Sequence, residues 1–371
     1  MCEKINILFL VSKFDIGGIQ KANISMINAI NKEKFNVHVL YIQDGILRQD
    51  ITNEVIDMVQ IGKVLKLKSF ININYILKTI KYIKQNDISI VHTIDAILYV
   101  VGATAAHFTK IKHIRSQPNF IRKYEKLNTK TLKILPFERW TDKYIAFNRA
   151  TKQDLYMAGV PMEKIQVIYN YPKIKNKDDE YSCVDIKEEI GVSPNTKLVC
   201  SIGRLVKGKG LEVYIRMIPF VIKKYINVVF LIVGDGPLRE ELSQMCRELK
   251  IEKYVYFLGF RTDISNIVQQ ITLGVYATDE SAGMIDIPMR YKVLISRQSN
   301  IMKEYIIDGK TGILVKSDEP EDYANSVLKL LRDETLLNYM EVNTKKYYKS
   351  NFDGDKNMKV LEDIIINLTV N

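Results

Sequence analysis

Cysteine is scarce in this 371-residue sequence, and the few cysteines show no spacing that would bind a metal. Cys2, Cys183, Cys200 and Cys246 form no CxxC pair and no zinc-like arrangement. Cys200 falls in an apolar run, where a cysteine usually serves as a small core residue. We therefore predict reduced thiols, as in a cytoplasmic protein, and no metal site.

Apolar runs long enough to cross a membrane are also missing. A spanning helix needs about 20 apolar residues, and the longest candidate, residues 96–108, is short and contains His107. The early run ILFLV at residues 7–11 predicts a buried strand, because no small-residue cleavage site of a signal peptide follows it. The sequence thus predicts a soluble or peripherally attached protein.

Acidic residues are outnumbered, with 43 Asp and Glu against 54 Lys and Arg and a formal net charge of +11. This excess predicts an anionic partner. Residues 109–143 alone hold ten Lys or Arg against three Asp or Glu, interleaved with aromatic and aliphatic residues, and Lys63, Lys66 and Lys68 add to this charge. Such a surface suits the inner face of an anionic membrane, whereas no RNP, KH or zinc pattern indicates nucleic acid. A solvated basic face is the alternative that stays open.

Strand-like apolar runs alternate with amphipathic segments along most of the chain, which is typical of an α/β fold with parallel sheets. Polar and charged residues at 173–195 interrupt this alternation. We therefore predict a Rossmann-like domain over residues 1–172, a linker over 173–195 and a second Rossmann-like domain over 196–345. Residues 346–371 form a predicted helix with an apolar stripe, and we expect it to pack back towards the first domain. The expected strands are residues 7–11, 35–42, 59–61, 88–92, 111–115, 144–147, 165–168, 198–202, 228–233, 255–257, 273–276, 293–295 and 313–315.

The stretch from residue 198 to 236 predicts a βαβ unit, because two apolar runs bracket an amphipathic segment of about two dozen residues. The first run ends in a turn at Gly203, and the second ends at Gly234, Asp235 and Gly236. Ligands of open α/β sheets bind beyond the carboxyl ends of the strands, so both turns are expected to face one crevice. Arg204 and Lys209 follow the first run, where a helix also begins, which favours a phosphate or diphosphate ligand.

The segment 203–210 also matches three of the four fixed positions of the P-loop pattern GxxxxGK[ST]. That motif needs a hydroxyl after the lysine to hold Mg²⁺, and Gly210 stands there instead. A P-loop NTPase is therefore the less favoured alternative.

A series of motifs in the second half resembles one enzyme family. The motifs are GRL at 203–205, KG at 209–210, GDGP at 234–237, FLG at 257–259 and DESAG at 279–283. In this order and at these intervals they resemble the C-terminal domain of the retaining GT-B glycosyltransferases of glycosyltransferase group 1, also called family 4. The resemblance is close over 195–345 and looser over 5–172. It implies two Rossmann-like domains that face a central cleft, the first for the acceptor and the second for the donor.

The resemblance also implies roles for residues of the second domain. Arg204 and Lys209 would neutralise the diphosphate of a UDP- or GDP-sugar without an obligatory metal, and Glu280 would position the donor sugar. Asp286 would hold the nucleotide ribose, with a helix N-cap as the equally weighted alternative. The glycine turns and their neighbours complete the implied donor site: Gly203, Gly234, Gly236, Pro237 and Gly283.

In the first domain, Gly17 and Gly18 resemble the glycine-rich loop that approaches the donor diphosphate in the family, although a tight turn alone would also explain them. Gln117 stands where the family often has a histidine that contacts the donor sugar. His92 ends another predicted strand, where either a sugar contact or packing in the core would account for it. Retaining members need no strong protein base, because the leaving phosphate can take the acceptor proton.

These expectations describe a glycosyltransferase that moves a sugar, with retention, to a carbohydrate or lipid-linked acceptor in bacterial surface-polysaccharide assembly. The site's departures from the family pattern at Gln117 and Asp286 leave one alternative of a different kind. The chain could be a catalytically weak homologue that acts as a binding or partner subunit.

Overall fold

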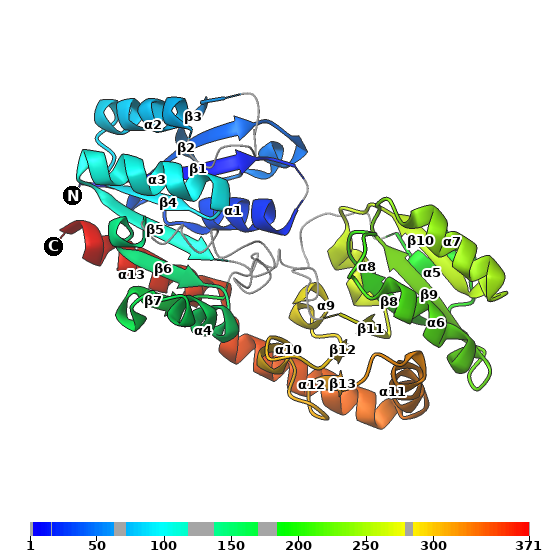
Figure 1. Ribbon diagram of the computed structural model, residues 1–371. Helices are drawn as coiled ribbons and strands as arrows, with labels where there is room; N and C mark the ends of the chain where they lie inside the picture. The colour runs from blue at the N-terminus through cyan, green and yellow to red at the C-terminus, as the bar shows by residue number, and fades with distance from the viewer. Residues whose placement is uncertain are drawn as a thin grey trace. The chain divides into compact units, whose positions relative to one another are not determined.

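A computed structural model describes residues 3–15, 17–62, 72–117, 137–169, 184–278 and 285–370. The chain divides into two compact units. The first unit comprises Met1–Lys173 together with Phe352–Asn371, and the second comprises Ile174–Asn351. Each unit is an α/β structure around its own parallel sheet (Figure 1). The predicted fold class, two Rossmann-like domains, is confirmed.

In the described part of the first unit, seven parallel strands pair in the order β3-β2-β1-β4-β5-β6-β7. These strands are β1 (Ile5–Lys13), β2 (Phe35–Gln43), β3 (Val55–Gln60), β4 (Ile90–Thr93), β5 (Lys112–Gln117), β6 (Lys143–Ala146) and β7 (Ile165–Val167). The helices of this unit are α1 (Gly18–Ala29), α2 (Ile73–Gln85), α3 (Ala96–Thr109), α4 (Arg149–Met157) and α13 (Gly354–Val370).

The central strand β1 shows why this sheet carries helices on both faces. Successive side chains of a strand point to opposite faces. Ile7, Phe9 and Val11 therefore join one core with α1 and α13, whereas Leu8 and Leu10 join the other core with α2 and α3 (Figure 1). A sheet buried on both faces needs a continuous apolar run, which is what ILFLV supplies.

The second unit repeats this plan with six described strands in the order β10-β9-β8-β11-β12-β13. They are β8 (Lys197–Ile202), β9 (Val228–Val233), β10 (Val255–Gly259), β11 (Leu273–Tyr276), β12 (Leu294–Arg297) and β13 (Gly312–Val315). The accompanying helices are α5 (Ile186–Glu189), α6 (Leu211–Ile222), α7 (Arg239–Glu248), α8 (Ile264–Gln270), α9 (Asp286–Met289), α10 (Met302–Tyr305), α11 (Pro320–Arg332) and α12 (Glu334–Asn351).

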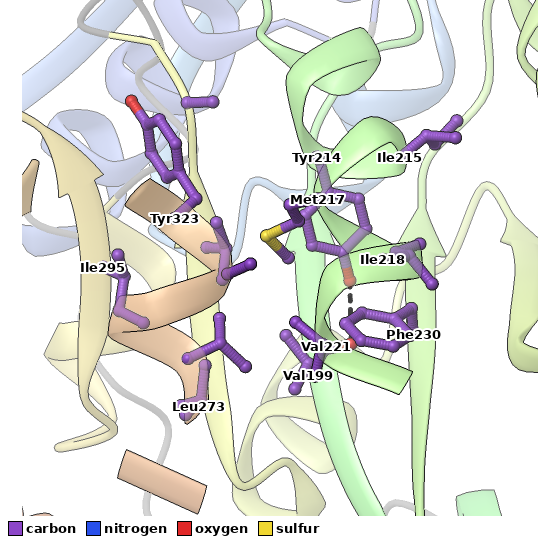
Figure 2. Close-up of a cluster of buried hydrophobic side chains, with 14 of the residues drawn as sticks. Val199, Tyr214, Ile215, Met217, Ile218, Val221, Phe230, Leu273, Ile295 and Tyr323 are labelled. Carbon is purple, nitrogen blue, oxygen red and sulfur yellow. Dashed lines mark hydrogen bonds between the residues drawn. The ribbon is translucent and has the colours of Figure 1, made fainter. Parts of the chain in front are cut away.

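The main core of the second unit lies between this sheet and helices that include α6, α7 and α11. Figure 2 shows Tyr214 of α6 and Phe230 of β9 within this core, together with Tyr323 of α11. The Tyr214 hydroxyl lies 2.9 Å from the backbone oxygen of Val199 and 3.2 Å from that of Leu231. This tyrosine therefore buries its ring without leaving its polar atom unsatisfied.

The end of the chain differs from the single helix expected over residues 346–371. Helix α12 continues to Asn351, and α13 begins at Gly354 after a short break. The Asp353 carboxylate accepts hydrogen bonds from the backbone N–H groups of Asp355 and Lys356, which gives the new helix a cap. Leu361 and Ile365 of α13 are buried in the core of the first unit.

The described part of the expected linker, from residue 184 onward, packs on the second unit. Ile186 is fully buried, and its backbone N–H donates to Gln270 of α8 at 2.9 Å. Arg261 bridges Asp263 at 2.7 Å and Glu189 of α5 at 2.5 Å. Residues 184–189 are thereby fixed to the segment that follows β10.

None of the described helices combines the length and the apolar character needed to cross a bilayer.

Candidate functional site

The candidate site of the second unit lies where its strand order reverses, between β8 and β11. This switch point is where ligands of open α/β sheets bind. The loop from Gly203 to Gly210 leaves the carboxyl end of β8 here and leads directly into α6. We call residues 203–210 the anion loop.

The turn after β9 holds one side of the anion loop. The Leu205 N–H donates to Asp235 O at 3.0 Å, and the Leu238 N–H donates to Leu205 O at 3.1 Å. A Cβ atom at Gly234 would collide with the Gly203 carbonyl, and one at Gly236 would collide with that of Leu205. Both positions therefore require glycine because backbone approaches backbone, and Pro237 lies exposed beside them.

The end of β11 and the residues that follow it hold the other side of the anion loop. The Thr278 hydroxyl donates to Gly208 O at 2.9 Å, and the Tyr276 hydroxyl donates to the Ile202 carbonyl. A Cβ at Gly210 would meet the Ala277 backbone, and Gly210 has a left-handed φ of 68°. A serine or threonine at position 210, as in a P-loop, would therefore clash with Ala277.

Arg204 and Lys209 both lie on the anion loop, Arg204 exposed and Lys209 half-buried. Lys209 precedes Gly210, which is the N-cap of α6. The first N–H groups of a helix have no partner within the helix and give its N-terminus a partial positive charge. The loop thus combines two cations with a positive helix end, which is the composition of an anion site.

Asp286 is the first residue of α9, and it is not a helix N-cap, since Ile285 occupies that position. Its carboxylate forms an ion pair with Arg290 at 3.1 Å. Its charge also contributes, after burial, to raising the pKa of Tyr276, so Asp286 lies near the carboxyl end of β11. Glu280 and Gly283 lie outside the described residues.

The switch point of the first sheet lies between β1 and β4. Asp95 follows β4 and is 8% exposed, and its carboxylate accepts hydrogen bonds from Ser12 of β1. Beyond β1, Gly17 is half-buried and extended, with φ of −177°, and the exposed Gly18 begins α1. No role for Asp95 can be predicted from the sequence, because its pairing with Ser12 appears only once the strands are aligned.

Gln117 is buried at the carboxyl end of β5. Its side-chain oxygen accepts hydrogen bonds from the Arg115 guanidinium at 2.8 and 3.1 Å. The same guanidinium lies over the ring of Tyr99, 3.8 Å from its centroid. Gln117 is therefore held in one orientation by a stacked arginine.

His92 lies inside the first unit. Its Nε2 is 2.8 Å from the Ser116 hydroxyl, and its ring packs edge-on against Phe9. Burial lowers the pKa of His92 to about 3, so the imidazole is neutral at pH 7. This geometry corresponds to the packed alternative for His92 rather than to a sugar contact.

Within the described ranges, no three Asp, Glu, His or Cys side chains come together as a metal site would require. Cys200 and Cys246 are buried free thiols, and burial raises the pKa of each, to about 11 for Cys246. Neither is suited to act as a thiolate at neutral pH.

Comparisons with known proteins cover nearly all of this architecture. Residues 16–171 match the family model described as Glycosyltransferase Family 4, and residues 185–347 match that of Glycosyl transferases group 1. An uncharacterised glycosyltransferase of Methanocaldococcus jannaschii is 26% identical over 292 residues, which are 71% of this chain and 72% of the relative.

The UDP-Gal:α-D-GlcNAc-diphosphoundecaprenol α-1,3-galactosyltransferase of Escherichia coli is 23% identical over 384 residues, 96% of this chain and 95% of the relative. Among solved structures, Anabaena HepE in complex with UDP and glucose superposes with a TM-score of 0.82 at 20% identity, covering 98% of this chain and 100% of that one. That likeness shows the fold. The two family matches, which follow the two units in order, show that the chain belongs to the group 1, family 4-like glycosyltransferases of the GT-B fold.

Proposed function

We propose that this chain transfers a hexosyl group from a UDP- or GDP-sugar to a carbohydrate or lipid-linked acceptor with retention at the anomeric carbon. The observation that carries this proposal is the anion loop, which bears Arg204 and Lys209 and leads into the N-terminus of α6 at a switch point. The E. coli relative supports the nucleotide-sugar donor and the lipid-linked acceptor, because its name contains both. The Anabaena structures with UDP and with UDP-glucose support a uridine donor.

The reaction breaks the bond between the anomeric carbon and the diphosphate and forms a bond from that carbon to an acceptor oxygen. Negative charge grows on the leaving diphosphate, and fixed cations lower the energy of that transition state. Arg204 and Lys209 supply these charges, and the first amides of α6 add hydrogen bonds. The acceptor proton passes to the leaving diphosphate, so the reaction needs no strong protein base.

The remaining candidates have supporting roles in this proposal. Gln117 offers an amide to a sugar hydroxyl, Asp286 accepts hydrogen bonds from the ribose, and Glu280 with Gly283 positions the donor sugar. Gly17 and Gly18 let the backbone approach the diphosphate. The proposed mechanism has no obligatory metal.

The test compares Lys209→Ala with Lys207→Ala, a matched loss of charge two residues away on the same loop. Loss of a transition-state charge contact costs about two or more orders of magnitude in rate, so we expect that loss for Lys209→Ala only. The donor is first identified by thermal stabilisation with a panel of UDP- and GDP-sugars, and the anomeric configuration of the product is read by NMR. Near-normal turnover of Lys209→Ala, or an inverted product, would contradict the proposal.

The second candidate function is a partner subunit without turnover. It is favoured by Asp286, whose carboxylate is already paired with Arg290. Its side chain is also shorter than that of the glutamate that the family places there. Calorimetry with UDP and a donor-hydrolysis assay separate the two, because a partner subunit would show neither binding nor hydrolysis.

We further propose that the first unit attaches the protein to the inner face of an anionic cytoplasmic membrane. Phe108 is 66% exposed at the end of α3, beside Trp140, on which His107 stacks at 4.4 Å. Lys110 and Arg139 are also exposed and lie within two residues of these aromatic residues in the sequence. Most of the basic segment, residues 118–136, lies outside the described residues. Co-sedimentation with anionic vesicles, lost on Phe108→Ser and absent with zwitterionic vesicles, is the expected result, and equal binding to both would refute it.

A further inference from the structure

Three consecutive residues at the end of β11, residues 276–278, fasten the anion loop and its start at three points. Tyr276 bonds to Ile202, where the loop leaves β8, and Thr278 bonds to Gly208 at 2.9 Å. Between them, the Ala277 backbone lies directly against Gly210. The end of β11 is therefore the support on which this loop rests.

Lys209 is the residue most affected by this support, because it lies between two of the anchored glycines. Gly208 has φ of 82° and Gly210 has φ of 68°, so the lysine is flanked by two left-handed residues. Glycine adopts such conformations at little cost but is also the least restricted residue. A loop with this flexibility needs an outside contact to hold one conformation, and Thr278 provides it for Gly208.

The hydrogen bond between Thr278 and Gly208 joins a buried side chain to an exposed loop. Thr278 is 5% exposed, whereas Gly208 is exposed, so the bond between them is shielded from water only on the threonine side. We therefore assign it the strength of an ordinary protein hydrogen bond rather than that of a fully buried one.

We propose that Thr278 is a positioning residue, whose hydroxyl fixes Gly208 so that the ammonium of Lys209 meets the diphosphate of the donor. The proposal rests on the function proposed above. Thr278 acts through the lysine and does not itself touch the reacting atoms. The chemistry it serves is the binding of a nucleoside diphosphate as a leaving group.

The chain offers a matched control at the other end of β11. Thr272 lies just before β11, at the opposite end of the strand, and its side-chain oxygen accepts a hydrogen bond from the Leu198 N–H at 3.1 Å. Thr272→Val therefore removes one hydroxyl-to-backbone bond between the same two strand regions, far from the anion loop. Thr278→Val removes the bond at the loop, and Thr278→Ser keeps it.

Turnover is measured first. A net hydrogen bond of ordinary strength corresponds to roughly tenfold, so we expect Thr278→Val to lower kcat/KM roughly tenfold with the nucleotide sugar. Thr278→Ser and Thr272→Val should stay near the wild-type value. In a Lys209→Ala background, Thr278→Val should cost nothing further, because its partner in catalysis is already gone. An additive loss in the double variant would overturn the proposal, since a merely structural role persists without the lysine.

A second measurement does not depend on activity. Amide hydrogen exchange of residues 206–210 should become faster in Thr278→Val than in wild type or in Thr272→Val. Unchanged exchange in this loop would refute the positioning role even if transfer activity is present. If exchange responds as expected but the wild type transfers no sugar, the proposed function fails and the structural support stands.

Discussion

The carboxylate of Asp95 accepts two hydrogen bonds from Ser12, one from its backbone N–H at 3.1 Å and one from its hydroxyl at 2.7 Å. Asp95 follows β4 and Ser12 belongs to β1, the two strands at the switch point of the first sheet. Thr278 and Gly208 form the equivalent contact in the second sheet. In both units, a residue that follows the fourth strand in chain order bonds either to the first strand or to the loop that leaves it.

The ionisation of Asp95 should make the stability of the first unit depend on pH. Burial raises the pKa of Asp95 more than the Ser12 hydrogen bonds and Lys13 lower it. The neutral carboxyl therefore fits this site better than the charged one. As the pH rises above the unfolded-chain value of 3.8, the unfolded state ionises first, so the carboxylate costs stability at pH 7 and not below pH 3.8.

We therefore expect Asp95→Asn to be at least as stable as wild type at pH 7, with any gain disappearing towards pH 4. Asp95→Ala should instead lose about 1–3 kcal/mol, because two buried donors of Ser12 lose their acceptor. Urea unfolding followed by the fluorescence of Trp140, the single tryptophan of the chain, reports on the first unit. Equal losses in both variants would show that the charge itself stabilises the unit.

Gly210 and Gly309 form a second matched pair, because their backbones are alike and their surroundings are not. Their φ values are 68° and 71°, but a Cβ at Gly309 meets no atom within 4 Å, whereas one at Gly210 meets the Ala277 backbone. Gly309→Ala should cost about 1–2 kcal/mol, the strain of a left-handed residue, and leave turnover near normal. Gly210→Ala should cost about 1–3 kcal/mol more through overpacking and lower turnover strongly. Similar unfolding free energies for the two variants would mean that the backbone of the anion loop can shift to accommodate a Cβ at position 210 at little cost.

The strands of both sheets could be predicted from the sequence because parallel strands buried on two faces appear as unbroken apolar runs. The edge strand β3 shows the limit, since its half-buried residues include Asp57 and only 59–61 was expected where the structure has Val55–Gln60. The GRL and KG motifs mark the glycines of the anion loop as candidate site residues. The contacts that explain Gly234, Gly236 and Gly210 depend on strand neighbours and appear only in the structure.

The supporting residues could not be predicted for the same reason. Asp95 bonds to a residue 83 positions away, and Thr278 bonds to one 70 positions away. Neither an aspartate nor a threonine is unusual at the end of a strand, so neither residue stands out in the sequence. The sequence does not distinguish packing from ligand contact for His92, because a histidine at the end of a strand is compatible with both. Its ring joins the core through Ser116, on the neighbouring strand β5.

Mild acid should weaken the first unit selectively. Burial lowers the pKa of His38, His92 and His113, and all four histidines of the chain belong to the first unit. Below the unfolded-chain value of 6.5 the unfolded state takes up protons that the folded state does not, so stability falls with pH. Each fully shifted histidine contributes up to about 1.4 kcal/mol per pH unit in this window, and Asp95 acts in the opposite direction.

The check compares urea midpoints at pH 7 and pH 5.5, by Trp140 fluorescence for the first unit and by far-ultraviolet circular dichroism for both. We expect the midpoint of the fluorescence transition to move to a lower urea concentration at pH 5.5. The part of the circular-dichroism transition that belongs to the second unit should keep its midpoint. A shift of equal size in both transitions would show that the histidines do not govern the acid response.

Glu362 should anchor α13 to the first unit by its acceptor atoms rather than by its charge. One carboxylate oxygen accepts a hydrogen bond from the Asn31 N–H at 2.9 Å, and the other lies 3.4 Å from the ammonium of Lys34, whose side chain is 44% exposed. Glu362→Ala leaves the Asn31 N–H without this acceptor and should cost about 1–3 kcal/mol in the first unit. Glu362→Gln keeps that acceptor and loses only a partly exposed ion pair, so it should cost less than about 1 kcal/mol.

Trp140 fluorescence again follows the unit concerned, although residue 362 comes after the whole second unit in the chain. Lys34→Met is the control, because it removes the ion pair from the other side while Glu362 keeps its bond to Asn31. It should behave like Glu362→Gln. If Lys34→Met and Glu362→Ala proved equally unstable, the ion pair would carry the docking of α13, and the backbone hydrogen bond would be secondary.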